Sequence, residues 1–399
     1  MDLEDSPEEA VFRSGIRDAL AELSARGVLA DRAMTPATHL QQFRATQAAL
    51  FEAGLVGLTW PADFGGQGAS PVRQIIVDQE LRRVGVPRVI NWIGIGMCGP
   101  AIIVHGTDEQ KRRYLAPLLR ADEIWCQLFS EPDAGSDLAG VHTRAERTTD
   151  DRWKVNGQKV WTTGAQWCDF GLLLARTNPE VPKHRGLTMF IVDMRAPGVS
   201  VRPLRDMTGH EHFNEVFLDD VVLDDSMRVG EVDSGWSVAI TMLMNERYTV
   251  SGDGSTYSAG PDDLLAQYKA ALARSSEAPD ASTRQEFAHC WIEALAIRMT
   301  GNRLITSIAR GEQPGAEGSV GKLAGATLLQ HAADLGLRLE GHDALFGSRA
   351  DGTDQWHYAS TFAPGVALAG GTSEIMKNII GERILGLPPE PRSDIKAGV

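Results

Sequence analysis

The sequence lacks any run of about 18 uninterrupted apolar residues, the length that a membrane-spanning helix requires. Its N-terminal segment, MDLEDSPEEAVF, is acidic and has no apolar core, so we expect neither a signal peptide nor a transit peptide. Basic residues are in the minority, and the formal net charge of −14 at pH 7 argues against nucleic acid or an anionic membrane as a partner. These absences predict a cytoplasmic protein that does not insert into a membrane.

Cysteine is also scarce. The four cysteines, Cys98, Cys126, Cys168 and Cys290, show neither the spacing of a metal site nor that of a redox pair. They stand mainly in apolar stretches, so we interpret them as reduced thiols of a protein core. The ten histidines lack ligand spacing as well, and the sequence therefore predicts no metal site.

The apolar periodicity changes twice along the 399 residues, which are enough for two or three domains. Residues 1–123 have helical spacing, with helix starts at Pro7 and Pro71 and a capping box formed by Thr107 and Gln110. This first part is therefore predicted to be helical.

The next part, 124–232, has the spacing of strands bounded by turn residues, which predicts a small antiparallel barrel or sandwich. The seven expected strands are 124–130, 152–157, 158–163, 170–176, 187–194, 199–204 and 214–223. Helical spacing returns near Gly230 and defines a third part, 233–399. Polar interruptions at about 251–262 and 347–356 are expected to be surface loops.

Two neighbouring segments of the strand-rich part carry candidate binding residues. After the apolar run from Cys126 to Phe129, a turn cluster contains Ser130, Gly135 and Ser136. These residues offer hydroxyls and an unhindered backbone, so N–H groups can approach an anionic ligand such as a pyrophosphate. The alternative is an ordinary loop rich in glycine and serine.

The second segment is predicted to be a β-hairpin that turns at Asn156-Gly157, because this pair between alternating apolar residues is a strong hairpin signal. The hairpin would present Trp161, whose indole can cover one face of a flat aromatic cofactor. It would also present Thr163, whose hydroxyl can bond a ring nitrogen. A hairpin with a core tryptophan is the alternative, and spacing alone leaves it open.

A carboxylate interrupts the apolar helix expected at 235–251, which we expect to be buried on nearly all sides. Its stripe consists of Ala239, Met242, Glu246 and Val250. Burial raises the pKa of a carboxylate, as a base near neutral pH requires. The alternative is pairing with a basic group on another helix. Arg247 points about 100° away around the helix and is not the obvious partner.

A second helix start lies near the C-terminus. Gly370 and Gly371 precede Thr372-Ser373-Glu374. A helix N-terminus that follows glycines, whose backbone no side chain hinders, is a natural anion site. An ordinary loop with an N-cap is the alternative.

Taken together, SEPDAGSD at 130–137 and NGQKVWTTGA at 156–165 resemble the paired signature of the acyl-CoA dehydrogenase family, and WPADFGG at 60–66 is similar to it too. The resemblance covers nearly the whole chain. It implies an N-terminal helical domain, 1–123, a middle antiparallel β domain, 124–232, and a C-terminal helical bundle, 233–399.

The resemblance also implies the reaction, which is FAD-dependent α,β-dehydrogenation of an acyl-CoA thioester with hydride transfer to flavin N5. Members of the family place the α-proton base either on the helix at 235–251, in a Glu-Arg pair, or just before a Gly-Thr near the C-terminus. Gly370 occupies the second position, so Glu246 is the implied base, as in the long-chain and isovaleryl branch. The expected process is β-oxidation of fatty acids or sterol side chains.

The remaining roles follow from the same resemblance. The implied FAD contacts are Gln127, Phe129, Ser130, Gly135, Ser136, Trp161, Thr163, Thr372 and Glu374. The implied acyl-CoA contacts are Ser136, Arg247 and Gly371. An electron-transfer flavoprotein is the usual electron acceptor, and a dimer or tetramer is expected.

The last part departs from the family pattern. Many members carry Arg-x-x-Phe-Gly, which helps a neighbouring subunit to hold its flavin pyrophosphate; here Arg284 and Phe287 keep the spacing, but Ala288 replaces the glycine. The usual Gln-x-x-Gly-Gly segment is missing, and residues 339–352 stand there instead. This resembles a bacterial branch of sterol side-chain and pimeloyl-CoA type dehydrogenases, in which two different subunits build each site. A paralogous partner is therefore expected.

Two other functions stay open as alternatives. One is a flavin oxidase or monooxygenase on the same fold, in which oxygen reoxidises the flavin. The other is a non-catalytic partner subunit of a hetero-oligomeric dehydrogenase, against which the intact signature and Glu246 argue.

Overall fold

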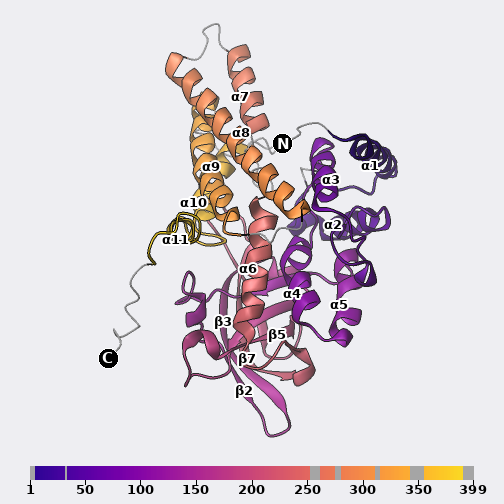
Figure 1. Ribbon diagram of the computed structural model, residues 1–399, viewed down its shortest axis with the longest axis vertical. Coiled ribbons are helices and arrows are strands. Elements are labelled where there is room, and N and C mark those ends of the chain that lie inside the picture. The colour runs from indigo at the N-terminus through magenta and orange to yellow at the C-terminus, as the bar shows by residue number, and fades with distance from the viewer. Residues whose placement is uncertain are drawn as a thin grey trace. The chain divides into compact units, whose positions relative to one another are not determined.

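The computed structural model describes residues 5–31, 34–251, 261–274, 280–310, 315–341 and 355–389 (Figure 1). The chain divides into two compact units, residues 1–246 and residues 247–399. Helix α6 (Gly235–Ser251) begins in the first unit and ends in the second. The predicted order of helices, strands and helices is confirmed. The two predicted surface loops fall largely on residues outside the described ranges.

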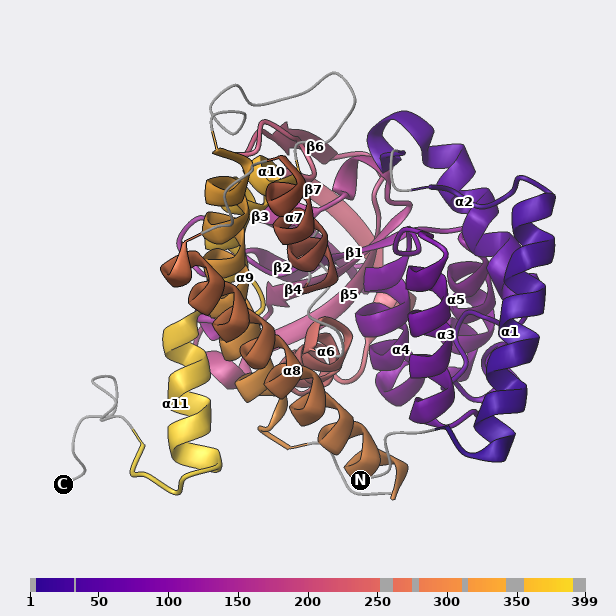
Figure 2. The same ribbon diagram turned by 90° about the horizontal axis from the view of Figure 1, so that it is seen from above.

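Helices form the N-terminal part of the first unit. They are α1 (Pro7–Ala25), α2 (Pro36–Glu52), α3 (Pro71–Arg83), α4 (Gly99–His105) and α5 (Asp108–Arg120). The predicted capping box of α5 is confirmed: the Gln110 N–H donates to Thr107 Oγ1 at 3.2 Å, and the Thr107 N–H donates to Gln110 Oε1 at 3.0 Å. α1 packs on α3, and α2 and α4 pack on α5 (Figure 2).

The carboxylate of Glu80 on α3 joins this helix to α1. Its side chain is 2% exposed and accepts hydrogen bonds from the guanidinium groups of Arg13, Arg17 and Arg83 at 2.6 to 3.0 Å. These bonds, led by that from Arg17, lower the pKa of Glu80 from 4.5 to about 2. Because the folded-state pKa is depressed, the stabilisation is present above pH 4.5 and is lost as the pH falls toward 2.

Replacing Glu80 with glutamine is expected to lower the free energy of unfolding by about 2 to 4 kcal/mol at neutral pH, because three guanidinium groups lose their shared carboxylate. We expect the lower end, since Arg17 and Arg83 are half-exposed and solvent screens their share. Urea unfolding measures the difference, with Glu22→Gln at an exposed position of α1 as the control. Equal stabilities, or a difference that does not shrink toward pH 2, would contradict the assignment.

One eight-stranded sheet completes the first unit. The strands are β1 (Trp125–Leu128), β2 (Arg144–Arg147), β3 (Arg152–Thr163), β4 (Phe170–Arg176), β5 (Leu187–Asp193), β6 (Val199–Leu204), β7 (Phe213–Asp224) and β8 (Arg228–Val229). Their order is β6-β7-β3-β2-β4-β5-β8, with β1 paired to β4. The pairs β1–β4 and β2–β4 are parallel and the others antiparallel. Strands β2 and β8 were not anticipated from the periodicity.

Both faces of the central strands are buried, which explains their unbroken apolar sequences. In β4, Leu172 and Leu174 belong to one apolar cluster, which also contains Leu115 of α5. Leu173 and Ala175 belong to a second cluster, on the other face. The first cluster therefore fixes the N-terminal helices onto the sheet.

The second unit is helical in its described residues. It contains α7 (Pro261–Arg274), α8 (Ala281–Ala309), α9 (Gly318–Glu340), α10 (Gln355–Val366) and α11 (Ser373–Arg383). Helix α9 contacts each of the other four. Its close approach to α10 requires Gly336, since a Cβ atom there would lie 2.1 Å from the Trp356 ring. The predicted C-terminal helical bundle is confirmed.

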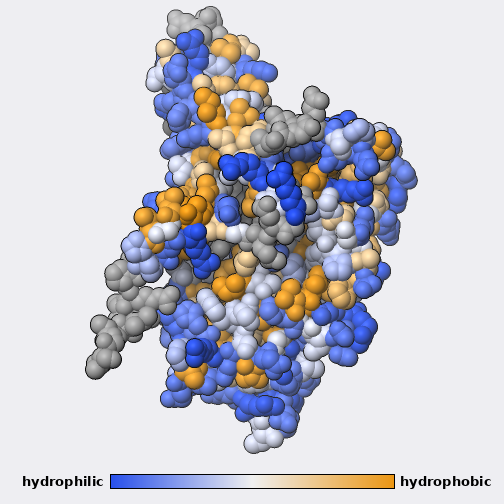
Figure 3. All heavy atoms as spheres, viewed as in Figure 1, coloured by the Kyte–Doolittle hydropathy of each residue, from blue (hydrophilic) through white to orange (hydrophobic). Residues whose placement is uncertain are grey.

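Apolar side chains gather on the surface of the second unit around α10 and α11 (Figure 3). The most exposed are Leu368, Ile384, Leu385 and Leu387, at 40% to 66%. Large apolar side chains gathered on the surface of a folded unit are typical of a protein contact surface. In the part of the chain that the structure describes, no helix is both long enough and apolar enough to cross a bilayer.

Candidate functional site

Strand β1 and the loop after it hold the first group of predicted site residues, with Gln127 in the strand and the others in the loop. These are Gln127, Phe129, Ser130, Gly135 and Ser136. Phe129 is buried, whereas Gln127 and Ser130 are half-buried and Gly135 and Ser136 are exposed. The loop therefore presents polar groups and bare backbone at its surface, while Phe129 anchors it in the apolar core of the unit.

The predicted hairpin at Asn156-Gly157 is wrong. β3 continues through this pair and keeps its pairing with β7 on both sides. The two strands instead form a bulge, in which Asn156 and Asp220 exchange two hydrogen bonds of 2.9 Å. The turn lies earlier, between β2 and β3, where the Thr148 N–H donates to the Arg152 carbonyl oxygen at 2.8 Å. The extended pairing with β7 thus prevented the turn that the Asn156-Gly157 pair favours.

Trp161 lies at a second irregularity of β3. The register with β7 shifts between Lys159 and Thr162, and Trp161 has a φ of 58°, a left-handed value that is strained for a bulky residue. Its indole is 58% exposed and meets the ring of Phe213 edge to face, with centroids 5.8 Å apart. A strained backbone therefore keeps a large aromatic side chain at the surface, and the core-tryptophan alternative does not hold.

Direct hydrogen bonds bring the two predicted segments together. The Val160 N–H donates to the Ser130 carbonyl oxygen at 2.9 Å, and the Lys159 ammonium donates to the Phe129 carbonyl oxygen at 3.0 Å. We call Phe129, Ser130 and residues 161–163 the cradle. Sequence reasoning missed Lys159; the available signal was a lysine at an inward position of an otherwise apolar strand face.

Glu246 lies on α6, at the end of the first unit. Ala239 and Met242, its neighbours on the predicted stripe, are fully buried in the same apolar cluster as Phe129. Glu246 itself is half-buried. The Glu246 carboxylate therefore lies where the buried face of α6 becomes partly exposed. Partial exposure is compatible with contact to a ligand.

The other face of α6 is less buried than we expected from its sequence. Ile240 and Met244 are 37% and 36% exposed, so burial on nearly all sides is wrong. On the same helix, Asn245 Nδ2 donates to the Thr241 carbonyl oxygen at 2.8 Å. The side chain of Arg247 lies outside the described part.

In the second unit, the Gly370-Gly371 pair precedes α11 with φ values of 65° and 96°, which glycine adopts without strain. Thr372 is the N-cap of α11, and its hydroxyl accepts the backbone N–H three residues on at 3.2 Å. Lys322 of α9 donates to the Gly371 carbonyl oxygen at 2.5 Å. The N-cap interpretation is confirmed. Anion binding here, with contacts from Thr372 and the exposed Glu374, stays a prediction.

The segment Arg284 to Ala288 lies in the first turns of α8. The ring of Phe287 stacks on Tyr268 of α7, with centroids 4.6 Å apart and planes 21° apart. Phe287 is therefore partly buried and packs against the core of the bundle. Most of the segment that replaces the Gln-x-x-Gly-Gly motif, residues 342–352, lies outside the described ranges.

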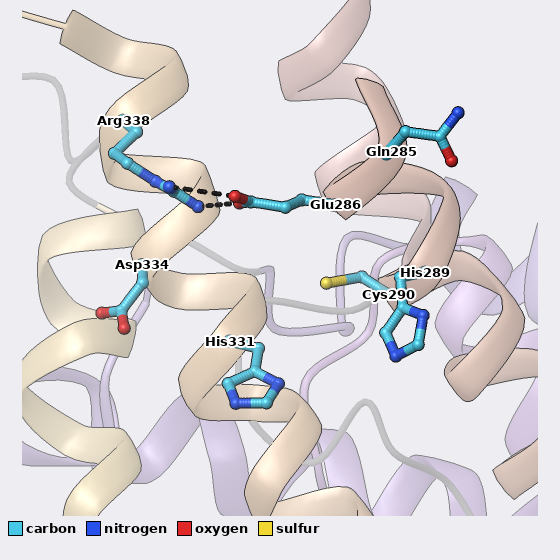
Figure 4. A pocket seen from close by; sticks show the side chains of 7 residues that line it. All are labelled: Gln285, Glu286, His289, Cys290, His331, Asp334 and Arg338. Atoms are coloured by element: carbon cyan, nitrogen blue, oxygen red, sulfur yellow. Dashed lines mark hydrogen bonds and ion pairs between the residues drawn. The ribbon is translucent and has the colours of Figure 1, made fainter. Parts of the chain in front are cut away.

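A pocket of about 480 Å³ lies beside this segment, between α8 and α9 (Figure 4). Its lining consists of Gln285, Glu286, His289 and Cys290 of α8 and His331, Asp334 and Arg338 of α9. Arg338 is hydrogen-bonded to Glu286 across the pocket (Figure 4). Two carboxylates and one already paired arginine make the pocket unfavourable for a phosphate group.

Comparison with known families gives three matches along the chain. The model of the acyl-CoA dehydrogenase N-terminal domain matches residues 6–122, that of the middle domain matches 126–221, and that of the C-terminal domain matches 233–385.

Individual proteins and structures match as well. Acyl-CoA dehydrogenase FadE34 of Mycobacterium tuberculosis is 39% identical over 345 residues, covering 86% of this chain but 46% of that protein. The chain thus spans less than half of FadE34. Acyl-CoA dehydrogenase IpdE1 of Mycolicibacterium smegmatis is 35% identical over 360 residues, covering 88% and 89%. The ChsE4-ChsE5 complex from Mycobacterium tuberculosis has 29% identity and a TM-score of 0.79, covering 98% of this chain and 100% of that chain.

Proposed function

Because this chain belongs to the acyl-CoA dehydrogenase family, we propose that it removes hydrogen from the α and β carbons of an acyl-CoA thioester with FAD as cofactor. The cradle is the observation that supports this most. Trp161 is held exposed beside a polar loop by a strained backbone. Strain of this kind persists where surrounding structure enforces it and is concentrated at functional sites.

The residues of the first unit fit the isoalloxazine end of FAD. Trp161 offers a ring face, while the Thr163 hydroxyl and the backbone of Phe129 and Ser130 offer hydrogen-bonding groups, with Gln127 on the strand before them. The exposed Gly135 and Ser136 fit a pyrophosphate or pantetheine. When bound, FAD would supply the group that accepts the β-hydrogen as a hydride, that is, together with the electron pair of its C–H bond.

Glu246 is the proposed base. Its carboxylate takes the α-proton, and the negative charge that develops falls on the thioester oxygen. Hydrogen bonds to that oxygen are worth more in a site from which water is excluded. Arg247, Gly371 and Ser136 are the proposed substrate contacts, and Thr372 and Glu374 are proposed flavin contacts from the second unit. Glu246 is half-buried beside the buried Met242, and this environment supports the assignment.

A paralogous partner subunit is the second part of the proposal. Phe287 packs against Tyr268 and the core of the bundle, Ala288 lacks the conformational freedom of glycine, and the adjoining pocket carries two carboxylates. The exposed apolar patch around α10 and α11 supports assembly. The similar ChsE4-ChsE5 structure is itself a complex. An electron-transfer flavoprotein is the proposed electron acceptor.

Substitutions at Trp161 separate the binding role of its ring from the strain of its backbone. Trp161→Ala and Trp161→Gly are both expected to weaken FAD binding about tenfold, because the ring face is lost. The glycine variant is expected to be about 1 kcal/mol more stable than the alanine variant, because only glycine relieves the left-handed φ. Flavin fluorescence titration and urea unfolding measure the two effects. Unchanged FAD affinity in both variants would contradict a place for Trp161 in the cradle.

A further inference from the structure

A buried ion pair lies directly beneath the cradle. Lys159 is fully buried, Glu131 is 7% exposed, and Lys159 Nζ lies 2.8 Å from Glu131 Oε1. The ammonium group has three hydrogens and donates to three acceptors: Glu131 Oε1, the Phe129 carbonyl oxygen at 3.0 Å and the Leu174 carbonyl oxygen at 2.8 Å. The ammonium group is therefore fully satisfied inside the protein.

Hydrogen bonds also hold both the carboxylate and the backbone of Glu131. Its Oε2 accepts the His142 N–H at 2.6 Å, and its Oε1 accepts the Thr143 N–H at 2.9 Å in addition to Lys159. Its backbone exchanges two hydrogen bonds with Ala134, of 2.9 and 3.1 Å. The carboxylate thus ties the loop after β1 to the segment before β2.

These bonds converge on the two halves of the cradle. Lys159 holds Phe129 and Glu131, the residues on either side of Ser130, and Val160 holds Ser130 itself. Lys159 and Val160 are also the two residues that precede Trp161 in β3. One short stretch of β3 therefore sets the position of the loop and that of the indole together.

Stability alone does not explain a pair of this kind. Removing two charges from water is costly, and apolar residues of similar size often stabilise a core as well or better. What apolar residues lack is the ability to hold three backbone and side-chain acceptors at fixed points. We infer that Lys159, through Glu131 and the Phe129 carbonyl oxygen, is a positioning residue that keeps the cradle in its flavin-binding geometry, an inference that rests on the proposed function.

The pair also makes the cradle sensitive to pH. Burial lowers the pKa of Lys159 from 10.5 to about 8, against the opposing effect of Glu131. Glu131, whose pKa burial alone would raise, is held below its usual value by Lys159, Thr143 and His142. The charged group that acts on this carboxylate from β4 is Arg176. Above pH 8 Lys159 loses a proton and one of its three donors, so the loop is expected to loosen.

The sign of the effect on global stability is opposite. Because the folded-state pKa of Lys159 is depressed, the unfolded chain binds more protons between pH 8 and 10.5, and this group makes the fold more stable as the pH rises through that window. A purely structural role therefore predicts no loss of flavin affinity on deprotonation. A positioning role predicts that the affinity falls while the contribution of Lys159 to stability rises.

The test uses the full chain, together with its partner subunit if FAD retention requires one. The variant is Lys159→Met/Glu131→Gln, which removes both buried charges, and the control is Lys154→Met, at a 42% exposed lysine of the same strand. Amide hydrogen exchange of residues 129–137 and 158–164 reports the order of the cradle. Flavin fluorescence titration from about pH 7 to about pH 9 reports affinity across the Lys159 transition.

In the wild type and the control, the FAD dissociation constant is expected to rise about tenfold across this pH range. Amide hydrogen exchange in both segments, once corrected for its intrinsic pH dependence, is expected to become faster. The double variant is expected to bind FAD about tenfold more weakly at neutral pH, without a pH transition. Wild-type affinity in the double variant, or a retained transition, would overturn the inference. If neither the wild type nor any variant binds FAD, the proposed function fails. Hydrogen exchange then tests the positioning role by itself. That role is refuted if the double variant exchanges at the wild-type rate, or if wild-type exchange shows no change across the pH range.

Discussion

Replacing Glu246 with glutamine is expected to abolish the bleaching of bound FAD by acyl-CoA under anaerobic conditions, while FAD binding stays normal. Glutamine has nearly the same shape but cannot accept the α-proton, so the reaction loses its base. A positioned general base contributes about a hundredfold to ten-thousandfold, and we expect a loss in the upper part of this range. Stopped-flow absorbance of the flavin after mixing with acyl-CoA measures the rate.

The matched control is Glu231→Gln, at a 90% exposed glutamate just before α6. It removes the same charge without touching the proposed site, so bleaching should proceed at the wild-type rate. Retained bleaching in Glu246→Gln would refute the base assignment. Wild-type protein that fails to bleach even with its partner would favour a non-catalytic subunit, and rapid reoxidation of bleached flavin in air would favour an oxidase. A panel of short, long, branched and steroidal acyl-CoAs extends the assay to substrate choice.

Expressed alone, the chain is expected to lose most of its FAD during gel filtration, and co-expression with a paralogous partner is expected to restore one FAD per site. The cradle is proposed to bind only the isoalloxazine end of FAD. The described residues of the second unit offer little for a neighbour's pyrophosphate, because Phe287 packs against Tyr268 and the pocket beside it carries Glu286 and Asp334. Absorbance ratios of flavin to protein across the elution peak give the occupancy.

Two results would contradict this prediction. Stoichiometric FAD on the chain alone would show that a single kind of subunit completes the site. Partial occupancy restored by added FAD alone would show that the partner is not needed. Leu385→Asp within the apolar patch is a useful companion variant, since a charge at this 66% exposed position should impair assembly if the patch is a subunit contact.

Local signals in the sequence were reliable wherever the physical cause was itself local. The capping box of Thr107 and Gln110 is made by two hydrogen bonds across three residues, so its pattern could be recognised without knowledge of the fold. The Asn156-Gly157 signal is equally short, but its outcome depended on β7, which lies about sixty residues further along the chain and continues to pair with β3 past the bulge.

The succession of a helical, a strand-rich and a second helical part, the family and most of the candidate residues could be read from the sequence, because periodicity, caps and paired motifs are local patterns. How the candidate residues are held could be learned only from the folded chain. The left-handed backbone of Trp161 arises from a register shift against another strand. The charge of Lys159 is tolerated because three acceptors, two from the loop after β1 and one from β4, surround it. Hydrogen bonds between distant segments produce no recognisable residue spacing in the sequence, and these bonds set the geometry of the cradle.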